Sequence, residues 1–221
     1  MRSVIVRRMS KKPISELRRG WTTGACATAA AKGAMAALQS GAFAQHVTIT
    51  LPRGETPRFA LAEADMGPGW AEAGVVKDAG DDPDVTHGAL IRVRAAWARK
   101  GAGLVIRAGK GVGMVTRAGL PVPVGSAAIN PVPRAMLTAE AKAFSEQDAR
   151  FCDVILTISV PGGDRLAQQT WNPRLGIEGG LSILGTTGIV RPFSCAAWIA
   201  SIHRGVDVAR AAGLMHVAGT T

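Results

Sequence analysis

GALIRVRAAWA, residues 88–98, is the stretch that decides the fold class. Its residues alternate between two faces. The apolar face carries Ala89, Ile91, Val93 and Ala95, and the basic face carries Arg92 and Arg94. A period of two is typical of an antiparallel strand that buries one face and leaves the other in solvent. The sequence therefore predicts a half-buried antiparallel strand here.

The flanking segments predict further strands and helices. Strands are expected at 46–51, 58–66, 71–80 and 152–161, and helices at 21–41 and 131–144. Residues 194–213 predict one or two more helices, and 215–218 predict a closing strand before a glycine–threonine turn. Strands that run ahead of helices, with antiparallel signals, favour the α+β class. We expect a mixed or antiparallel sheet with helices packed on it.

The charge of the chain is concentrated at its beginning. The formal net charge is +10, and residues 1–20 form a basic arm with seven Arg or Lys and one Glu. A basic arm can contact nucleic acid, but the chain has no Tyr and no aromatic platform among its basic residues. A polyanionic small molecule explains a mildly basic body equally well. We therefore expect no nucleic-acid partner.

Hydropathy and cysteine usage narrow the class further. No stretch approaches the ~20 apolar residues of a membrane-spanning helix, and the N-terminus lacks a signal-peptide core. We expect no membrane association and a cytoplasmic location. The three cysteines are far apart, which indicates neither a disulfide framework nor a metal knuckle. Cys26 fits a small buried thiol better than a nucleophile, because no histidine partner pattern accompanies it.

Four glycine- and proline-rich turns, at 21–27, 109–125, 129–134 and 172–192, are candidates for ligand binding. Any single turn of this kind is most often a hairpin. Glycine also lets a backbone approach a ligand closely, and a helix that begins at 22–24 would offer its positive end to an anion. The number of such turns, with Thr, Asn and Arg among them, favours an anion-binding role.

KDAGDDPDVTHG, residues 77–88, gathers four aspartates and a histidine around a proline. A solvated loop, a magnesium site and a catalytic pocket are all compatible with this composition. The spacing does not match an EF-hand loop. Clustered carboxylates raise some of one another's pKa values, and a nearby histidine can share the proton. The segment thus favours an acid/base or cation-holding cluster.

Taken together, these segments resemble the CbiD family, the cobalt-precorrin-5B C(1)-methyltransferases of anaerobic cobalamin biosynthesis. The resemblance rests on LRRGWTTGACATAAAK, VVKDAGDDPDVTHGA, GKGVGMVTRAGLPVPVGSAAINPVPR and TWNPRLGIEGGLSILGTTGIVRPFS, which occur in the family's order. It implies transfer of a methyl group from S-adenosylmethionine to ring carbon C-1 of an anionic cobalt-tetrapyrrole, giving cobalt-precorrin-6A.

With that chemistry in view, the sequence predicts roles for individual residues. His87, oriented by Asp82 or Asp84, is the expected general base. The predicted catalytic group is Asp81, Asp82, Asp84 and His87. Predicted substrate contacts are Thr22, Thr23, Gly24, Asn130, Arg134, Asn172 and Arg174. The predicted donor-binding turn is Gly185, Thr186, Thr187 and Gly188. No residue is assigned to a metal.

The resemblance also predicts a domain organisation. Residues 21–204 are expected to form the α+β tetrapyrrole-binding and catalytic domain, and 205–221 to begin a second α/β domain that this chain lacks. Residues from about 205 onward are then expected to pack poorly, to be disordered or to be covered by another copy of the chain. The alternative function is a catalytically silent tetrapyrrole-binding module, and a homo-oligomer is a possible assembly.

Overall fold

The computed structural model describes residues 16–219, so most of the predicted basic arm lies outside the described residues. Within them, the centre is a five-stranded sheet of order β4-β5-β6-β10-β7. Its strands are β4 Glu63–Gly67, β5 Trp70–Val76, β6 Leu90–Trp97, β7 Val105–Ala108 and β10 Val154–Ser159. Within this five-stranded sheet, β10 and β7 pair in parallel and the other neighbours are antiparallel. The predicted antiparallel strand at 88–98 is confirmed as β6.

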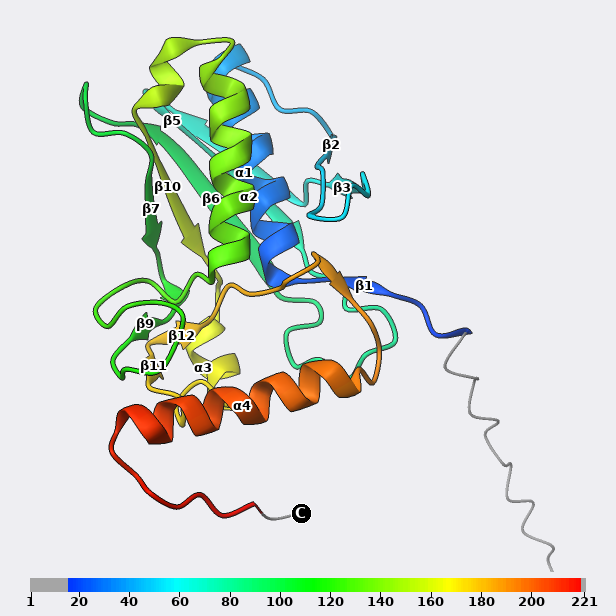
Figure 1. Cartoon of the computed structure of the whole chain (residues 1–221). Coiled ribbons are helices and arrows are strands. Elements are labelled where there is room, and N and C mark those ends of the chain that lie inside the picture. The colour runs from blue at the N-terminus through cyan, green and yellow to red at the C-terminus, as the bar shows by residue number, and fades with distance from the viewer. Residues whose placement is uncertain (1–15, 220–221) are drawn as a thin grey trace, which may run out of the picture.

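Two helices cover one face of this sheet (Figure 1). Helix α1 is Thr23–Ser40 and helix α2 is Pro131–Ser145. The alanine-rich α1 lies so close to β5 and β6 that its inner residues are fully buried, and Ile91 and Val93 of β6 are 0% exposed beneath it. Small side chains permit this close packing of helix on sheet. The mixed sheet with packed helices confirms the α+β class.

Short elements complete the molecule around the sheet. Three two-stranded pairs lie below it or at its edge: β1 Gly20–Trp21 with β13 Ile189–Val190, β8 Gly111–Val112 with β12 Gly180–Leu181, and β9 Met114–Val115 with β11 Ile177–Glu178. A fourth joins β2 His46–Thr48 to β3 Arg58–Ala60, while α3 Gly163–Ala167 and a 3-10 turn, Ala149–Cys152, flank β10. The predicted glycine-rich turns at 109–125 and 172–192 thus contain short paired strands, whereas those at 21–27 and 129–134 lead into α1 and α2.

Glycines let β8 approach both its partner β12 and the residue that follows β10, backbone to backbone. A Cβ on Gly111 would lie 2.0 Å from the carbonyl oxygen of Val160, and one on Gly180 would lie 2.2 Å from that of Gly111. Real Cβ atoms do not approach that closely, so only glycine fits. At these positions the glycines allow the chain to contact itself rather than a ligand.

Helix α4, Cys195–Ala211, lies apart from helices α1 and α2, below the sheet (Figure 1). Val208 is its one buried residue, and Trp198 is 63% exposed. The predicted closing strand at 215–218 is wrong: residues 214–219 have no regular structure and are exposed. A strand needs an edge to pair with, and the described backbone hydrogen bonds include none from 215–219. No helix among residues 16–219 is long and apolar enough to cross a membrane.

Candidate functional site: the acidic loop and the glycine-rich end of the sheet

The acidic loop, which we define as residues 77–88, connects β5 to β6 and binds other parts of the chain. Asp78 pairs with the guanidinium of Arg18, and Asp81 accepts a hydrogen bond of 2.9 Å from the Arg18 backbone N–H. The Arg18 hydrogen bond holds the pKa of the Asp78 carboxyl below its usual range. Asp82 accepts from the backbone N–H of Phe193 at 2.9 Å. Three aspartates of the loop therefore bind the segments that lead into β1 and into α4.

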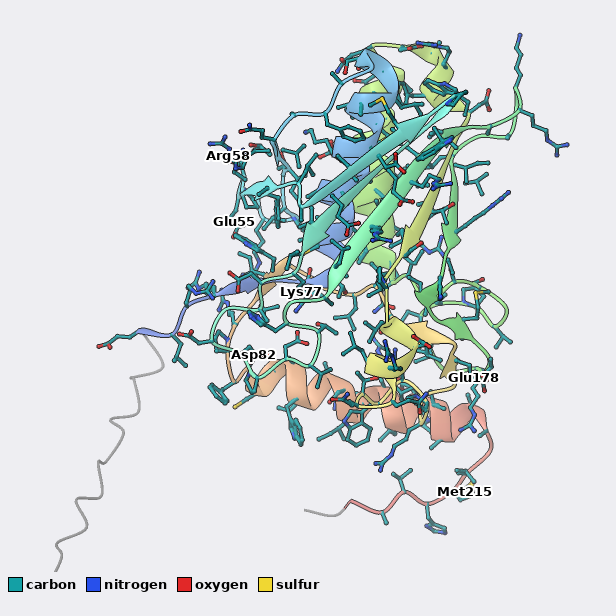
Figure 2. All side chains as sticks on the ribbon, turned by 180° about the vertical axis from the view of Figure 1, so that it is seen from behind. Glu55, Arg58, Lys77, Asp82, Glu178 and Met215 are labelled. Atoms are coloured by element: carbon teal, nitrogen blue, oxygen red, sulfur yellow. The ribbon has the colours of Figure 1, made fainter. Side chains whose placement is uncertain are left out.

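The fourth aspartate lies against a buried lysine. The Lys77 ammonium, whose side chain is 2% exposed, donates to Asp84 at 2.7 Å. The other Asp84 oxygen accepts from the N–H and hydroxyl of Thr86. Burial opposes ionisation of Asp84, but these hydrogen bonds outweigh it, and the pKa of the carboxyl lies below its ordinary value. Figure 2 shows Lys77 near the root of the loop and Asp82 further out.

His87 is the one histidine of the loop, and its side chain is 53% exposed. Its Nδ1 accepts the Ala79 backbone N–H at 3.1 Å and lies 3.8 Å from an Asp78 oxygen. The Asp84 carbonyl accepts the His87 backbone N–H at 2.9 Å, but among the described contacts neither the Asp82 nor the Asp84 carboxylate reaches the His87 ring, contrary to the predicted orientation, because both carboxylates have other partners. A neutral ring in this position carries its proton on Nε2, so it presents a donor to solvent.

Removing a single aspartate of the loop should loosen the segment it holds. Phe193 has a left-handed backbone, φ 55°, and the Asp82 hydrogen bond helps to hold it there. We expect Asp82→Ala to raise the rate of amide hydrogen exchange in the first turn of α4 about tenfold, because the substitution removes one charge-assisted hydrogen bond. Asp81→Ala is the matched control, because it should loosen residues 18–21 instead. Equal exchange in both variants would contradict this.

The predicted substrate contacts at the start of α1 are buried. Thr22 caps the helix through Ala25 N–H, and Gly24 N–H donates to the Leu184 carbonyl at 2.9 Å. Thr23 Oγ1 accepts the Leu184 N–H at 2.9 Å. The helix N-terminus is therefore satisfied by residues 182–184, and Thr22 and Thr23 are only 6% and 3% exposed. Burial in the protein also raises the pKa of the Cys26 thiol to about 12, so this thiol stays protonated.

The predicted donor-binding turn packs on the same helix start. A Cβ on Gly185 would lie 2.4 Å from Thr22 Oγ1, and one on Gly188 would lie 2.5 Å from Leu51. Thr187 Oγ1 accepts the Ile189 N–H, and Gly188 accepts from the Thr22 N–H through its carbonyl. Thr186 is exposed. Both glycines thus serve contacts within the chain.

Three other predicted substrate contacts stand at the turns beside α2 and β12. Arg134 donates to the carbonyls of Ile129 and Ala127, at 2.9 and 3.3 Å. Asn172 is 7% exposed and donates to the Gly180 carbonyl at 3.1 Å. Asn130 begins α2 and is half-buried. Arg134 and Asn172 therefore hold turns together through these hydrogen bonds.

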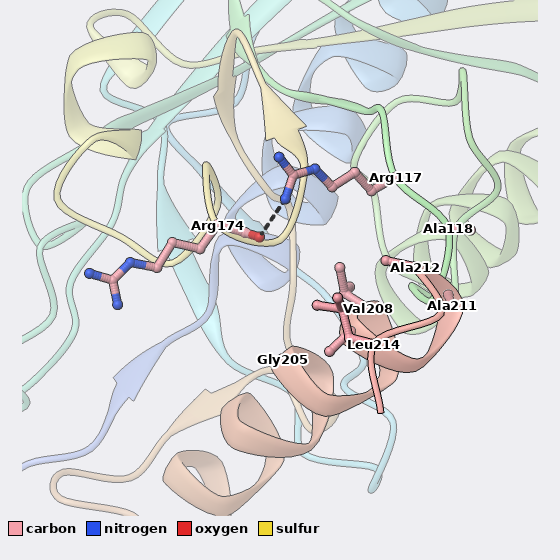
Figure 3. Close-up of a pocket in the computed structure, with 9 residues that line it drawn as sticks. Arg117, Ala118, Arg174, Gly205, Val208, Ala211, Ala212 and Leu214 are labelled. Atoms are coloured by element: carbon pink, nitrogen blue, oxygen red, sulfur yellow. Dashed lines mark hydrogen bonds between the residues drawn. The ribbon is translucent and has the colours of Figure 1, made fainter. Parts of the chain in front are cut away.

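Arg174, by contrast, is exposed and lines a pocket together with Arg117 (Figure 3). The pocket has a volume of about 360 Å³ and lies between these two turns and the end of α4. Its apolar wall is Val208, Ala209, Ala211, Ala212 and Leu214. Of the predicted site residues, only Arg174 lines this pocket.

Sequence reasoning missed both Arg117 and Lys77. A signal for Lys77 existed: it continues the alternation of Ala71, Ala73 and Val75, which all face the core. Arg117 carried no such signal. It reaches the pocket because the 109–125 turn folds against residues 172–176. Arg117 and Arg174, which are in contact there, are 57 residues apart in the chain.

The fold and this pocket define an α+β protein with a candidate site for anionic ligands. The family model of CbiD matches residues 10–192, and the chain belongs to the CbiD family.

Relatives and a solved structure agree with this. The chain is 62% identical, over 94% of its length, to the cobalt-precorrin-5B C(1)-methyltransferase of Brucella anthropi, and 64% identical, over 93%, to that of Rhodospirillum rubrum. It spans 56% of the length of each. A crystal structure of the cobalamin biosynthesis protein CbiD from Archaeoglobus fulgidus matches 85% of this chain and 59% of that one, with a TM-score of 0.61 and 29% identity.

Proposed function

We propose that this protein acts in the S-adenosylmethionine-dependent methylation of ring carbon C-1 of cobalt-precorrin-5B, giving cobalt-precorrin-6A in cobalamin biosynthesis. The observation that carries the proposal is the identity of 62–64%, over nearly the whole chain, to relatives named for that reaction. The exposed arginine pair at the pocket supports it, since the substrate is anionic. A cytoplasmic location, the absence of a nucleic-acid partner and a homo-oligomeric assembly stay predictions.

S-adenosylmethionine would supply the methyl group. The turn predicted to bind it, residues 185–188, does not fit the donor in this arrangement, because its glycines contact Thr22 and Leu51. The pocket beside Arg117 and Arg174 is an unsuitable alternative, since two guanidinium groups repel a sulfonium cation. We therefore assign no residue of 16–219 to the donor.

His87 is the group of the acidic loop that we propose to contact the substrate. Methylation of a ring carbon requires a proton to leave the conjugated system, so a group that accepts or relays a proton is needed. Asp81, Asp82 and Asp84 are engaged by backbone or by Lys77, whereas the His87 Nε2 has no partner among the described residues. Nδ1 accepts the Ala79 N–H, so His87 can take up a proton only when this hydrogen bond opens; a proton can then enter at Nδ1 while the Nε2 proton leaves. The three aspartates then act by positioning the loop.

Methyl transfer is tested directly by incubating the chain with cobalt-precorrin-5B and S-adenosylmethionine and measuring the mass of the tetrapyrrole product. A gain of one methyl group in place of one proton supports the proposal. Binding of tetrapyrrole without turnover, and without calorimetric binding of the donor, would favour the silent binding module.

His87→Asn separates chemistry from structure, because the Asn side chain can keep the acceptor for Ala79 N–H while losing Nε2. In a protein that turns over, we expect His87→Asn to lower turnover about 100-fold, within the range of general acid–base contributions. Its melting temperature should match that of the wild type. Unchanged turnover would return His87 to a purely structural role.

A further inference from the structure

We infer that the pocket between Arg117, Arg174 and the end of α4 binds a carboxylate-bearing edge of a tetrapyrrole. The identity of the ligand as a tetrapyrrole rests on the proposed function. Its anionic and apolar character and its place of binding are inferred from the residues that line the pocket. The pocket lining contains two arginines and seven Gly, Ala, Val or Leu residues, with no acidic side chain. Its volume, about 360 Å³, lies within the range of small-molecule sites.

The position of Arg117 is fixed by the protein. A Cβ on Gly176, at φ 72°, would lie 2.4 Å from Arg117 Cγ, so the arginine stem lies directly on the Gly176 backbone. Its guanidinium donates to the Arg174 carbonyl at 3.4 Å, a long hydrogen bond that uses one of five N–H groups. No carboxylate pairs with it among residues 16–219. The remaining N–H groups are available to an anion.

Arg174 lines the pocket with its backbone, and its side chain extends outward from the pocket (Figure 3). Its guanidinium lies 5.3 Å from the centre of the Trp171 ring, and it too has no carboxylate partner in the described part of the chain. Stacking on an aromatic ring leaves the in-plane N–H groups of a guanidinium free for a bidentate contact. Trp171 is 44% exposed, which adds a flat apolar surface beside the charge.

The opposite wall of the pocket is apolar. Figure 3 shows Val208, Ala211, Ala212 and Leu214 on one side and the Arg117 side chain with the Arg174 backbone on the other, while the Arg174 guanidinium is directed away from the apolar wall. A ligand that contacts both sides must carry an apolar body and an anionic edge. Simple phosphate or acetate lacks the body, and a neutral apolar molecule lacks the edge. A tetrapyrrole fringed with acetate and propionate groups has both, with the ring edge against α4, one carboxylate toward Arg117 and another, on the part of the ring that extends out of the pocket, toward Arg174.

Fluorescence titration with coproporphyrin III, a tetrapyrrole with propionate side chains, tests this without methyl donor or turnover. We expect Arg117→Gln and Arg174→Gln each to weaken binding about tenfold, as loss of a charge-assisted contact does. Arg204→Gln is the matched control, because Arg204 lies on α4 outside the pocket and pairs with Asp207. It should change the affinity less than about twofold, within the usual range for a rim charge.

Two further measurements guard against a folding artefact and against non-specific ring binding. Leu214→Asp adds a carboxylate to the apolar wall at a residue that is 59% exposed, so it should fold normally and weaken binding at least about tenfold. The methyl ester of the porphyrin, which has no carboxylates, should bind weakly and equally to wild type and both arginine variants.

Absence of porphyrin binding to the wild type, ester binding as tight as that of the acid, or unchanged affinity in both folded arginine variants would each overturn the inference. These outcomes are separate from failure of the proposed function. If porphyrin binding depends on the arginines but no methyl transfer occurs, only the proposed reaction is contradicted. If methyl transfer occurs but binding does not depend on the arginines, only the assignment of the pocket is contradicted.

Discussion

Asp84→Ala is expected to destabilise the protein by about 3–5 kcal/mol, because it leaves the buried Lys77 ammonium without its partner. The lysine is among the largest fully buried side chains, and no other carboxylate within residues 16–219 pairs with it. Urea unfolding followed by far-UV circular dichroism measures the change. Asp65→Ala removes an exposed carboxylate of β4 and should stay within about 0.5 kcal/mol of wild type. Equal effects of the two substitutions would contradict a stabilising Lys77–Asp84 pair.

The same pair predicts a pH dependence with a defined sign. Because hydrogen bonds lower the pKa of Asp84 in the folded state, its ionised form stabilises the fold above the ordinary aspartate pKa of about 3.9. That contribution is lost as the pH falls below this value toward the folded pKa. The difference in unfolding free energy between wild type and Asp84→Ala should therefore shrink below about pH 4. A difference that stays constant from pH 7 to 3 would contradict the assignment.

Gly111→Ala should have an effect of similar size for a different reason. Gly111 has φ 79°, which costs a residue with a side chain about 1–2 kcal/mol, and its Cβ would meet the Val160 carbonyl oxygen at 2.0 Å. Backbone atoms cannot move aside as a flexible side chain can. We expect a total loss of about 4 kcal/mol or more, in the range that marks a specific structural cause. Urea unfolding measures the loss.

Gly179→Ala is the matched control, since Gly179 has φ 81° and no atom within 4 Å of its would-be Cβ. Its cost should be the conformational part alone, about 1–2 kcal/mol. Two equal losses would show that the close approach of Gly111 to Val160 contributes nothing.

The sheet and its helices were predictable because their signals are local. Alternation places Ile91 and Val93 on one face of β6 wherever that strand lies, and an alanine-rich run with a threonine cap forms α1 in the same way. The strand expected at 215–218 shows the limit of such signals. A strand is stable only with a neighbouring edge, and residues 215–219 have none among the described hydrogen bonds.

The acidic loop and the glycine-rich turns depended on long-range contacts. Their composition was compatible with ligand binding, but the structure supplies protein partners: Phe193 N–H for Asp82, Lys77 for Asp84 and the Leu184 backbone for the start of α1. These partners lie from 7 to more than 100 residues away along the chain. A sequence pattern cannot distinguish a carboxylate that is free to bind a ligand from one that is hydrogen-bonded to another segment of the chain.

The sequence by itself determined the α+β class, the strand at the centre of the sheet, the capped alanine-rich helix and the resemblance to the CbiD family. Each follows from residues that are neighbours in the chain or from motifs that keep their order. Only the tertiary structure decided which polar groups are free. It buried Thr22, Thr23 and Asn172, engaged the aspartates, and brought Arg117 beside Arg174 against α4. The physical reason is that a polar group in a folded chain takes the nearest partner in space, and folding alone sets which partner that is.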